Sequence, residues 1–194
     1  MIHWIYNHWI EIIGALLSLT YLILEVKRNW TMWIIGIISS IFYVYIFFKA
    51  KLYAETGLNL YYAVLSVYGL YAWKFASTKN DAGSVFHHLS IRLAIILTAV
   101  TLFVFAGMIF ILVRYTDSTV PIPDALVAAL GIVGTWMTAR KIVECWYLWI
   151  FANIFATGLY ISQNLYPTAI LYIVYSALSF VGLREWRKSV TQKQ

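Results

Sequence analysis

The sequence predicts an all-α integral membrane protein with seven transmembrane helices in a three-plus-one-plus-three arrangement. The chain has 194 residues, of which 62% are hydrophobic and 11% charged, and its mean hydropathy is +0.78. Soluble domains have roughly 45–50% apolar and about 25% charged residues. Seven apolar stretches approach the ~20 residues that a helix needs to cross the hydrocarbon core. The first three of these stretches also resemble the last three.

Polar segments separate the seven apolar stretches. A polar linker with two adjacent histidines, residues 76–90, follows the third stretch, and Pro121 and Pro123 mark a loop between the fourth and the fifth. The whole chain, residues 1–194, is predicted to form one transmembrane domain. In chain order, the predicted helices cover residues 10–26, 30–48, 52–73, 91–113, 125–140, 144–166 and 166–186.

Basic residues are unequally distributed over the two membrane faces that alternating helices define. Eleven of the 14 Lys and Arg residues fall on one face, and Lys49, Lys51 and Arg114 fall on the other. Cytoplasmic loops are rich in Lys and Arg, so the N-terminus is predicted outside and the C-terminus in the cytoplasm. This bias also accounts for the formal net charge of +6, and no nucleic-acid partner is expected beside the lipid bilayer.

Two three-helix segments match along the chain, and they predict two repeats. Trp30-Thr-Met-Trp33 is paired with Trp146-Tyr-Leu-Trp149, and a three-residue difference in length precedes the third helix of each repeat. From there the pairs are Tyr62 with Tyr175, Ser66 with Ser179, Gly69 with Gly182 and Trp73 with Trp186. Repeat 1 covers residues 10–74, the linker helix 91–113 and repeat 2 125–188. One linker helix makes the repeats parallel, and transporters built from repeats bind substrate at the repeat interface.

One face of the sixth predicted helix is polar and aromatic over its whole length. At steps of three and four residues this face carries Trp146, Trp149, Asn153, Thr157 and Tyr160. A helix that met only lipid would gain nothing from an amide, a hydroxyl and two indoles in line. We therefore interpret this stripe as the wall of a small-molecule site inside the bundle.

Further candidates for this site come from the second, third and seventh helices: Trp33, Asn59, Tyr62 and Tyr175. A buried amide without a hydrogen-bond partner costs on the order of 2–7 kcal/mol, so Asn59 and Asn153 should face the interior. The alternative for both is an interhelical hydrogen bond that only holds helices together. For tryptophans the alternative is the aromatic belt at the membrane interface, to which Trp73 and Trp186 are assigned.

The chemistry of these candidates favours a flat cationic ring that bears hydroxyl or amino groups. Aromatic faces attract cations, each contact contributing ~0.5–2 kcal/mol. Glu11, Glu25, Glu55 and Glu144 fall near predicted helix ends, so neither a deep carboxylate nor a proton relay is expected. The sequence has no catalytic constellation, cofactor motif or metal-ligand cluster, and an enzyme, a cofactor and a metal are not expected.

Several motifs together resemble the PnuC family of bacterial vitamin transporters. They are the Trp-x-x-Trp pairs, the Leu-Tyr dipeptide before the third helix of each repeat, and the Gly-x-x-x-Trp endings at Gly69 and Gly182. The resemblance covers residues 14–188. It implies facilitated diffusion of nicotinamide riboside across the inner membrane for NAD biosynthesis, driven by a cytoplasmic kinase that phosphorylates the substrate. It also implies a helix plan like that of SWEET sugar transporters, and a homotrimer.

By this resemblance Trp146, Trp149 and Asn153 line the substrate site, and Asn59 faces them. Relatives carry thiamine, which is also a flat cation, and the sequence does not separate the two substrates. A SWEET-type sugar uniporter and a non-transporting membrane scaffold or receptor remain open as other classes. The sequence indicates no role for His87 and His88.

Overall fold

The computed structural model describes residues 2–49, 53–75, 86–116, 120–162, 164 and 166–191, and these residues form seven α-helices. The prediction of an all-α, seven-helix protein is confirmed. Four helices, α4 to α7, are long and apolar enough to span a membrane, and α1 and α2 contain shorter apolar stretches, Ile13–Val26 and Met32–Ile46. The helices are α1 (Ile2–Val26), α2 (Met32–Lys49), α3 (Tyr53–Lys74), α4 (Ile91–Tyr115), α5 (Pro121–Ala139), α6 (Cys145–Ser162) and α7 (Tyr166–Thr191).

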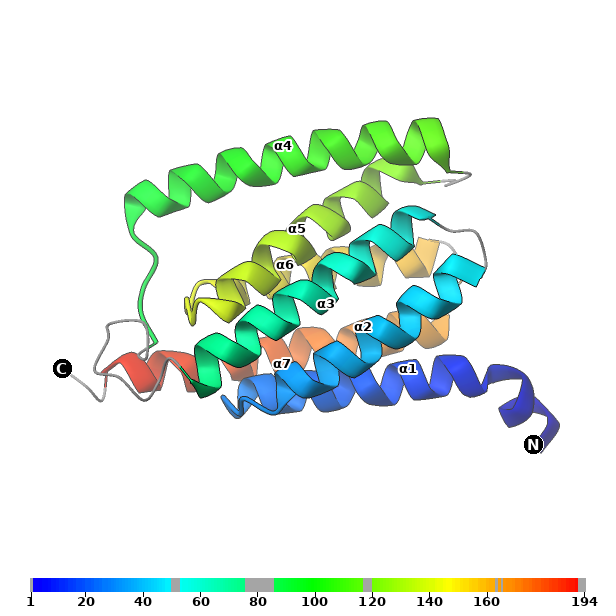
Figure 1. Ribbon diagram of the computed structural model, residues 1–194, viewed down its shortest axis with the longest axis horizontal. Helices are drawn as coiled ribbons and strands as arrows, with labels where there is room; N and C mark the ends of the chain where they lie inside the picture. The colour runs from blue at the N-terminus through cyan, green and yellow to red at the C-terminus, as the bar shows by residue number, and fades with distance from the viewer. Residues whose placement is uncertain are drawn as a thin grey trace.

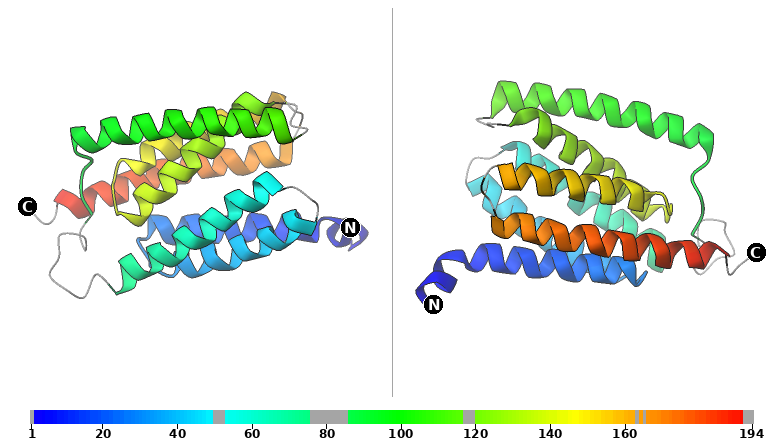
Figure 2. Two further views of the ribbon diagram at one scale, coloured as in Figure 1. Left: turned by 45° about the horizontal axis from the view of Figure 1, so that its top comes forward. Right: turned by 180° about the vertical axis from the view of Figure 1, so that it is seen from behind.

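The helices lie side by side in one bundle, with α4 along its outer edge (Figures 1 and 2). The pairs α2–α3 and α6–α7 are in extensive contact, and α1 lies against both α2 and α7. The remaining helix, α5, packs on α3, α4 and α6. The start of α1 and the end of α7 lie at opposite ends of the bundle (Figure 1).

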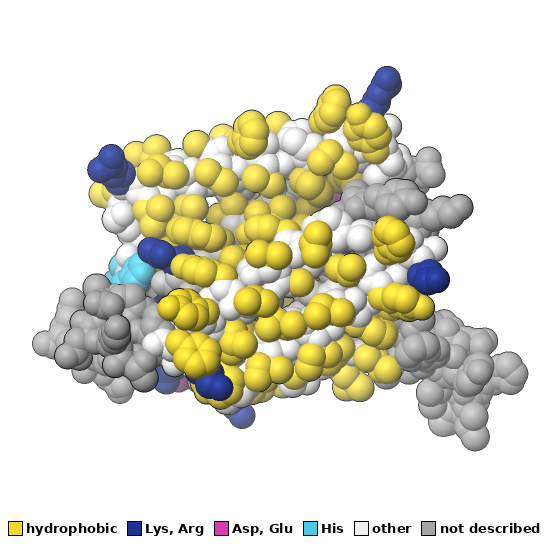
Figure 3. All heavy atoms as spheres, viewed as in Figure 1, with side chains coloured by type: hydrophobic (Ala, Val, Ile, Leu, Met, Phe, Trp, Pro, Cys, Tyr) yellow, Lys and Arg dark blue, Asp and Glu magenta, His cyan; other side chains and the backbone are white. Residues whose placement is uncertain are grey.

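The outer surface of the bundle is that of a protein that meets lipid. Hydrophobic side chains cover the middle of the face shown in Figure 3, and Lys and Arg side chains lie toward its ends. On α4, Phe103 is 80% exposed and Leu102 is 62% exposed. A water-soluble monomer rarely exposes an apolar surface of this extent, whereas the hydrocarbon core of a membrane favours it.

Several helix ends differ from the predicted ones, and for the starts of α1 and α5 the sequence shows the reason. Helix α1 begins at Ile2 instead of residue 10, since no Gly or Pro interrupts the chain between these positions. The predicted loop around Pro121 and Pro123 ends earlier than expected, because both prolines lie in the first turn of α5. Proline fits there because the first N–H groups of a helix have no intrahelical acceptor. The part of the polar linker at residues 76–85 lies outside the described residues.

Two tryptophan–glycine contacts hold α2 to α3 and α6 to α7. A Cβ atom on Gly69 would lie 2.5 Å from Cδ2 of Trp33, and one on Gly182 would lie 2.3 Å from Cη2 of Trp146. Both indoles are completely buried. In both, the N–H group has no hydrogen-bond partner among the described residues.

These contacts correct the register of the predicted repeat in its second helix. Trp33 was paired with Trp149, but Trp146 makes the contact that is equivalent to that of Trp33. Trp33 and Trp146 are separated by the same number of residues as Gly69 and Gly182. With this pairing the two repeats align without the three-residue difference in length that the sequence comparison assumed before the third helix. In this register Asn153 corresponds to Ser40. The repeat as such stays a prediction.

Substitution of Gly182 by alanine is expected to lower the free energy of unfolding by about 1–3 kcal/mol, because the new methyl group overlaps a buried ring. Gly158→Ala is the matched control on α6, since a Cβ atom there meets nothing within 4 Å. Thermal unfolding of both purified variants in detergent compares them. A melting temperature of Gly182→Ala equal to that of Gly158→Ala would contradict the prediction.

The assignment of Trp73 and Trp186 to the membrane interface is wrong. Trp73 is 7% exposed and Trp186 is 0% exposed. Their ring centroids lie 5.8 Å apart, and the Phe86 ring lies 5.6 Å from Trp73 and 4.6 Å from Trp186. The Trp73 indole donates to the carbonyl of Ala139 (3.2 Å), and that of Trp186 to the carbonyl of Glu25 (3.0 Å). The ends of α3 and α7 meet inside the bundle, so these rings face each other rather than lipid headgroups.

Five rings form a continuous layer at this end of the bundle. Trp33 packs edge-on against Trp73 at 6.0 Å, and Trp146 packs edge-on against Trp186 at 5.3 Å. With Phe86 these four tryptophans are called the aromatic layer below. Edge-to-face pairs contribute about 0.5–1.5 kcal/mol each beyond the area that they bury. The layer therefore ties together α2, α3, α6 and α7.

The two adjacent histidines fix the end of the polar linker to the turn between α5 and α6. His87 pairs with Ile142 in an isolated parallel β-bridge. Nδ1 of His88 lies 2.7 Å from Oε1 of Glu144. Together these contacts hold Phe86 in the aromatic layer, a role that the sequence did not indicate.

Candidate functional site

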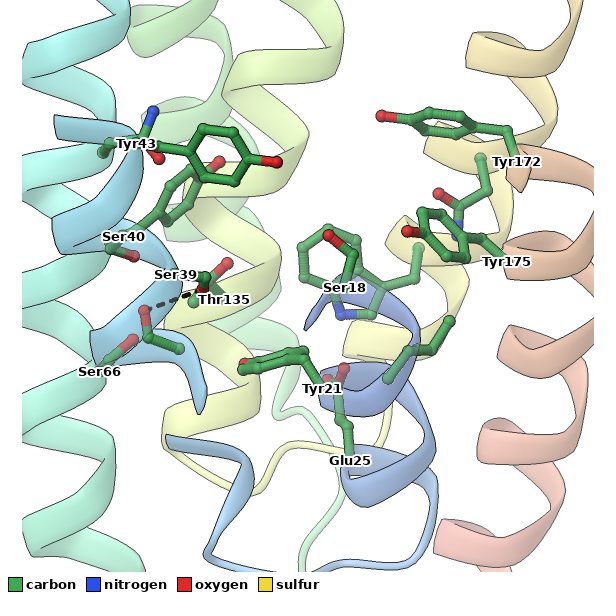
Figure 4. A pocket seen from close by; sticks show the side chains of 16 residues that line it. Ser18, Tyr21, Glu25, Ser39, Ser40, Tyr43, Ser66, Thr135, Tyr172 and Tyr175 are labelled. Atoms are coloured by element: carbon green, nitrogen blue, oxygen red, sulfur yellow. Dashed lines mark hydrogen bonds between the residues drawn. The ribbon is translucent and has the colours of Figure 1, made fainter. Parts of the chain in front are cut away.

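A cavity of about 350 Å³ lies in the middle of the bundle. Its lining comes from α1, α2, α3, α5, α6 and α7, and consists mainly of hydroxyl, phenol, indole and amide groups (Figure 4). The volume falls within the ~300–1,000 Å³ of small-molecule pockets. In Figure 4 the cavity lies between Tyr43 and Tyr172 at the top, and Tyr21 and Glu25 lie at its bottom.

Five of the nine residues predicted for the site line this cavity: Asn59, Tyr62, Trp149, Asn153 and Tyr175. They come from α3, α6 and α7, and they were chosen because helical periodicity placed them on interior faces. The structure thus brings together residues that lie far apart in the chain. That they contact a substrate stays a prediction.

The other four predicted residues lie beside the cavity and do not line it. Trp33 and Trp146 are completely buried in the aromatic layer, so their surfaces are covered by protein. The Thr157 hydroxyl donates to the backbone carbonyl of Asn153 (2.8 Å), and the Tyr160 ring packs against Tyr172 at 5.0 Å. The stripe on α6 runs along the whole helix, but the cavity meets only its middle, at Trp149 and Asn153, which periodicity alone does not show.

Asn153 makes the interhelical hydrogen bond that was its alternative role, and it also lines the cavity. The side chain is 8% exposed, and its Nδ2 donates to Oγ of Ser179 at 3.1 Å. Ser179 in turn donates to the backbone carbonyl of Tyr175 at 2.8 Å. The amide of Asn153 is therefore held in one orientation before any ligand binds.

Tyr175 lines the cavity, but its hydroxyl is covered by protein. It is buried near Ser18, but without the geometry of a hydrogen bond to any described residue. A buried polar atom without a partner costs about 1–3 kcal/mol. A small rotation of the side chain toward Ser18 or toward a ligand in the cavity would remove that cost.

A hydrogen-bonded chain runs from the aromatic wall of the cavity to its bottom. Nε1 of Trp149 donates to Oγ1 of Thr138 at 3.3 Å, and that hydroxyl donates to Oε1 of Glu25 at 3.0 Å. The Trp149 ring also lies close to Gly134, where a Cβ atom would be 3.1 Å from Cζ2. The indole is thus fixed from two sides.

The expectation of a site without a deep carboxylate is wrong. Glu25 is 2% exposed and lines the cavity, although it lies one residue before the end of α1. The hydrogen bond from Trp186 to the Glu25 carbonyl holds this end of α1 inside the bundle. A position near a helix end was interpreted as a position near the membrane surface, and tertiary packing overrides that inference here.

Serine and threonine hydroxyls, and the phenols of Tyr21, Tyr43 and Tyr172, also line the cavity but were not predicted for the site. Small polar side chains on α1, α2, α3 and α5 line the cavity: Ser18, Ser39, Ser40, Ser66 and Thr135. Such residues also occur at plain helix–helix contacts in membranes, so their sequence signal is weak. Among the described residues, no group of three or more His, Cys, Asp or Glu side chains is placed to hold a metal ion. The lining is suited to binding a polar aromatic molecule.

A sequence model of one membrane transporter family, described as nicotinamide mononucleotide transporter, matches residues 8–188. The chain belongs to this family. The predicted resemblance to PnuC proteins is confirmed by this match and by the similar proteins below.

The similarity to individual members of related transporter groups covers nearly the whole chain of this protein. It is 25% identical over 209 residues to the nicotinamide riboside transporter PnuC of Escherichia coli (strain K12), covering 95% of this chain and 87% of that protein. It is 26% identical over 182 residues to the riboflavin/roseoflavin transporter RibM of Streptomyces davaonensis, covering 92% and 84%. A crystal structure of the vitamin B3 transporter PnuC has the same fold, with a TM-score of 0.76, 22% identity, and coverage of 100% and 87%.

These comparisons establish the general class of the protein. The similar proteins are named as transporters, in agreement with the prediction that the chain is not an enzyme. The protein is a multi-pass membrane transporter of the nicotinamide mononucleotide transporter family.

Proposed function

We propose that the protein is a uniporter that carries nicotinamide riboside across the bacterial inner membrane by facilitated diffusion. The observation that carries this proposal is the central cavity, with an indole, several phenols and two amides in its lining. Nicotinamide riboside combines a flat cationic ring with a hydroxyl-rich sugar. Aromatic faces attract the first, and amide and hydroxyl groups bind the second. The name of the Escherichia coli relative supports the same substrate.

The driving force in this proposal is metabolic. A cytoplasmic kinase phosphorylates the substrate after entry, so the inward gradient persists without ion coupling. Glu25 is the one acidic or basic side chain in the described lining, and a single carboxylate does not form a relay across the membrane. The proposal includes an external N-terminus, a cytoplasmic C-terminus, two parallel three-helix repeats with a SWEET-like plan, and a homotrimer.

Uptake into proteoliposomes tests the proposed function. Labelled nicotinamide riboside should enter without any ion gradient and equilibrate across the membrane. Enclosing a riboside kinase and ATP in the liposomes should raise the accumulated label, because the phosphorylated product does not leave. Strict dependence of uptake on a Na⁺ or proton gradient would contradict the uncoupled mechanism.

Competition by other vitamins tests the substrate. Thiamine is the alternative cation, and the similarity to RibM makes riboflavin the second competitor. Excess nicotinamide riboside should suppress uptake of its own label more strongly than either vitamin or glucose. Stronger competition by glucose would favour a sugar uniporter, and absence of all uptake would favour a scaffold or receptor.

A further inference from the structure

The Glu25 carboxylate has an unusual position for an acidic side chain. It lies at the bottom of the cavity, where Figure 4 shows it pointing past Tyr21 toward the cavity interior. It is 2% exposed, and its Oε1 accepts the hydroxyl of Thr138. All other side chains in the described lining are neutral hydroxyl, phenol, indole, amide or apolar groups.

A carboxylate at this place does not serve the stability of the fold. A buried charge is costly unless an opposite charge meets it. Glu25 also lies in the last turn of α1, where the negative end of the helix dipole disfavours a second negative charge. A neutral glutamine of the same shape would accept the Thr138 hydrogen bond as well. A carboxyl group in place of an amide at this position therefore points to a cation that enters the cavity.

The relation between the two predicted repeats places this carboxyl group beside the axis between them. In the register given by the tryptophan–glycine contacts, Glu25 of α1 corresponds to Thr138 of α5, and these two residues are hydrogen-bonded to each other. Equivalent residues that touch lie beside the axis that relates the repeats. One repeat supplies a carboxylate at the axis and the other supplies the hydroxyl that orients it.

The aromatic wall lies next to the same carboxylate. Thr138 links Glu25 to the indole nitrogen of Trp149 through two hydrogen bonds, so an aromatic ring and a negative charge adjoin at one end of the cavity. A flat cation that stacks on an aromatic face and meets a carboxylate satisfies both groups. A neutral flat ring stacks on the aromatic face but leaves the carboxylate without a partner.

We propose that Glu25 is the counter-charge by which this transporter selects cationic substrates over neutral ones. The inference rests on the proposed function, because it assigns one substrate-binding role within that site. It places cationic nicotinamide riboside and thiamine in the accepted class, and neutral flavins outside it.

The test compares Glu25→Gln with a matched surface variant. Glu185→Gln makes the same chemical change on α7, where the carboxylate is paired with Lys188 at 2.6 Å outside the cavity lining. The two ligands are nicotinamide riboside and its uncharged dihydro form, which is nearly identical in size. Calorimetry on purified protein gives four dissociation constants for the variants and two for the unsubstituted protein.

Glu25→Gln should weaken binding of the cation roughly 10- to 100-fold and leave binding of the dihydro form unchanged. Glu185→Gln should change neither. An undiminished preference for the cation in Glu25→Gln would overturn the inference and leave the proposed function in place. Unsubstituted protein that binds neither form of the riboside would overturn the proposed function.

A second comparison covers the case in which Glu25→Gln does not fold. Unsubstituted protein should bind the cation more tightly than the dihydro form, and Glu25→Asp, which keeps the charge, should retain this preference. Equal affinity of the unsubstituted protein for both forms would overturn the inference without any variant.

Discussion

Replacement of Trp149 by alanine is expected to raise the dissociation constant for nicotinamide riboside roughly 100-fold or more. Two losses combine in this variant. The cation loses an aromatic face worth ~0.5–2 kcal/mol, and Thr138 loses the indole N–H that helps to orient it toward Glu25. The empty space left by the indole also enlarges the cavity and lets water reach the ligand. Each 1.4 kcal/mol corresponds to tenfold in affinity.

Two comparators on α6 and α2 make this prediction specific to the cavity. Asn153→Ala should weaken binding by roughly 5- to 150-fold, because it leaves polar ligand atoms unpaired. Ile37→Ala should have a smaller effect, since Ile37 does not line the cavity. Dissociation constants on monodisperse protein decide the order. Equal effects of Ile37→Ala and Asn153→Ala, or a smaller effect of Trp149→Ala than of Asn153→Ala, would show that the site lies elsewhere.

Replacement of Trp186 by alanine is expected to lower the free energy of unfolding by about 3–5 kcal/mol, the usual range for a buried tryptophan. The variant loses ring contacts with Trp73, Trp146 and Phe86, and the hydrogen bond to the carbonyl of Glu25. The aromatic layer would then contain a void that no neighbouring side chain can fill without moving a helix.

The matched control for Trp186→Ala is Phe103→Ala on α4, an aromatic residue that is 80% exposed. Reversible unfolding in detergent, followed by circular dichroism, gives both free energies. If Trp186 belonged to the interfacial belt, its replacement by alanine would change the free energy of unfolding as little as that of Phe103. Equal melting temperatures of the two variants would therefore restore the belt assignment and remove Trp186 from the aromatic layer.

Hydropathy was sufficient to find the helices because the membrane imposes a minimum apolar length on each of them. Within the helices, periodicity correctly placed Asn59, Tyr62 and Trp149 on faces that meet in the cavity. Periodicity identifies a face but not the part of it that a neighbour covers. Trp33 and Trp146 are covered because a glycine on the adjacent helix lets each indole lie against the backbone.

Glu25 and Phe86 could not be found from the sequence for a different reason. Both belong to segments whose depth depends on contacts with distant parts of the chain. The end of α1 is held by Trp186, and the end of the linker is held by the turn between α5 and α6. Hydropathy near a helix end or in a polar linker contains no information about such contacts.

The unsubstituted chain contains one cysteine, and its burial makes it a chemical reporter of local opening of the bundle. Cys145 is completely buried at the start of α6, immediately before Trp146 of the aromatic layer. Because the thiol is covered by protein, a thiol reagent in the medium reaches this sulfur only when the surrounding residues move apart. The rate of maleimide labelling, with and without substrate, therefore measures how often the start of α6 becomes accessible, on protein that carries no engineered label.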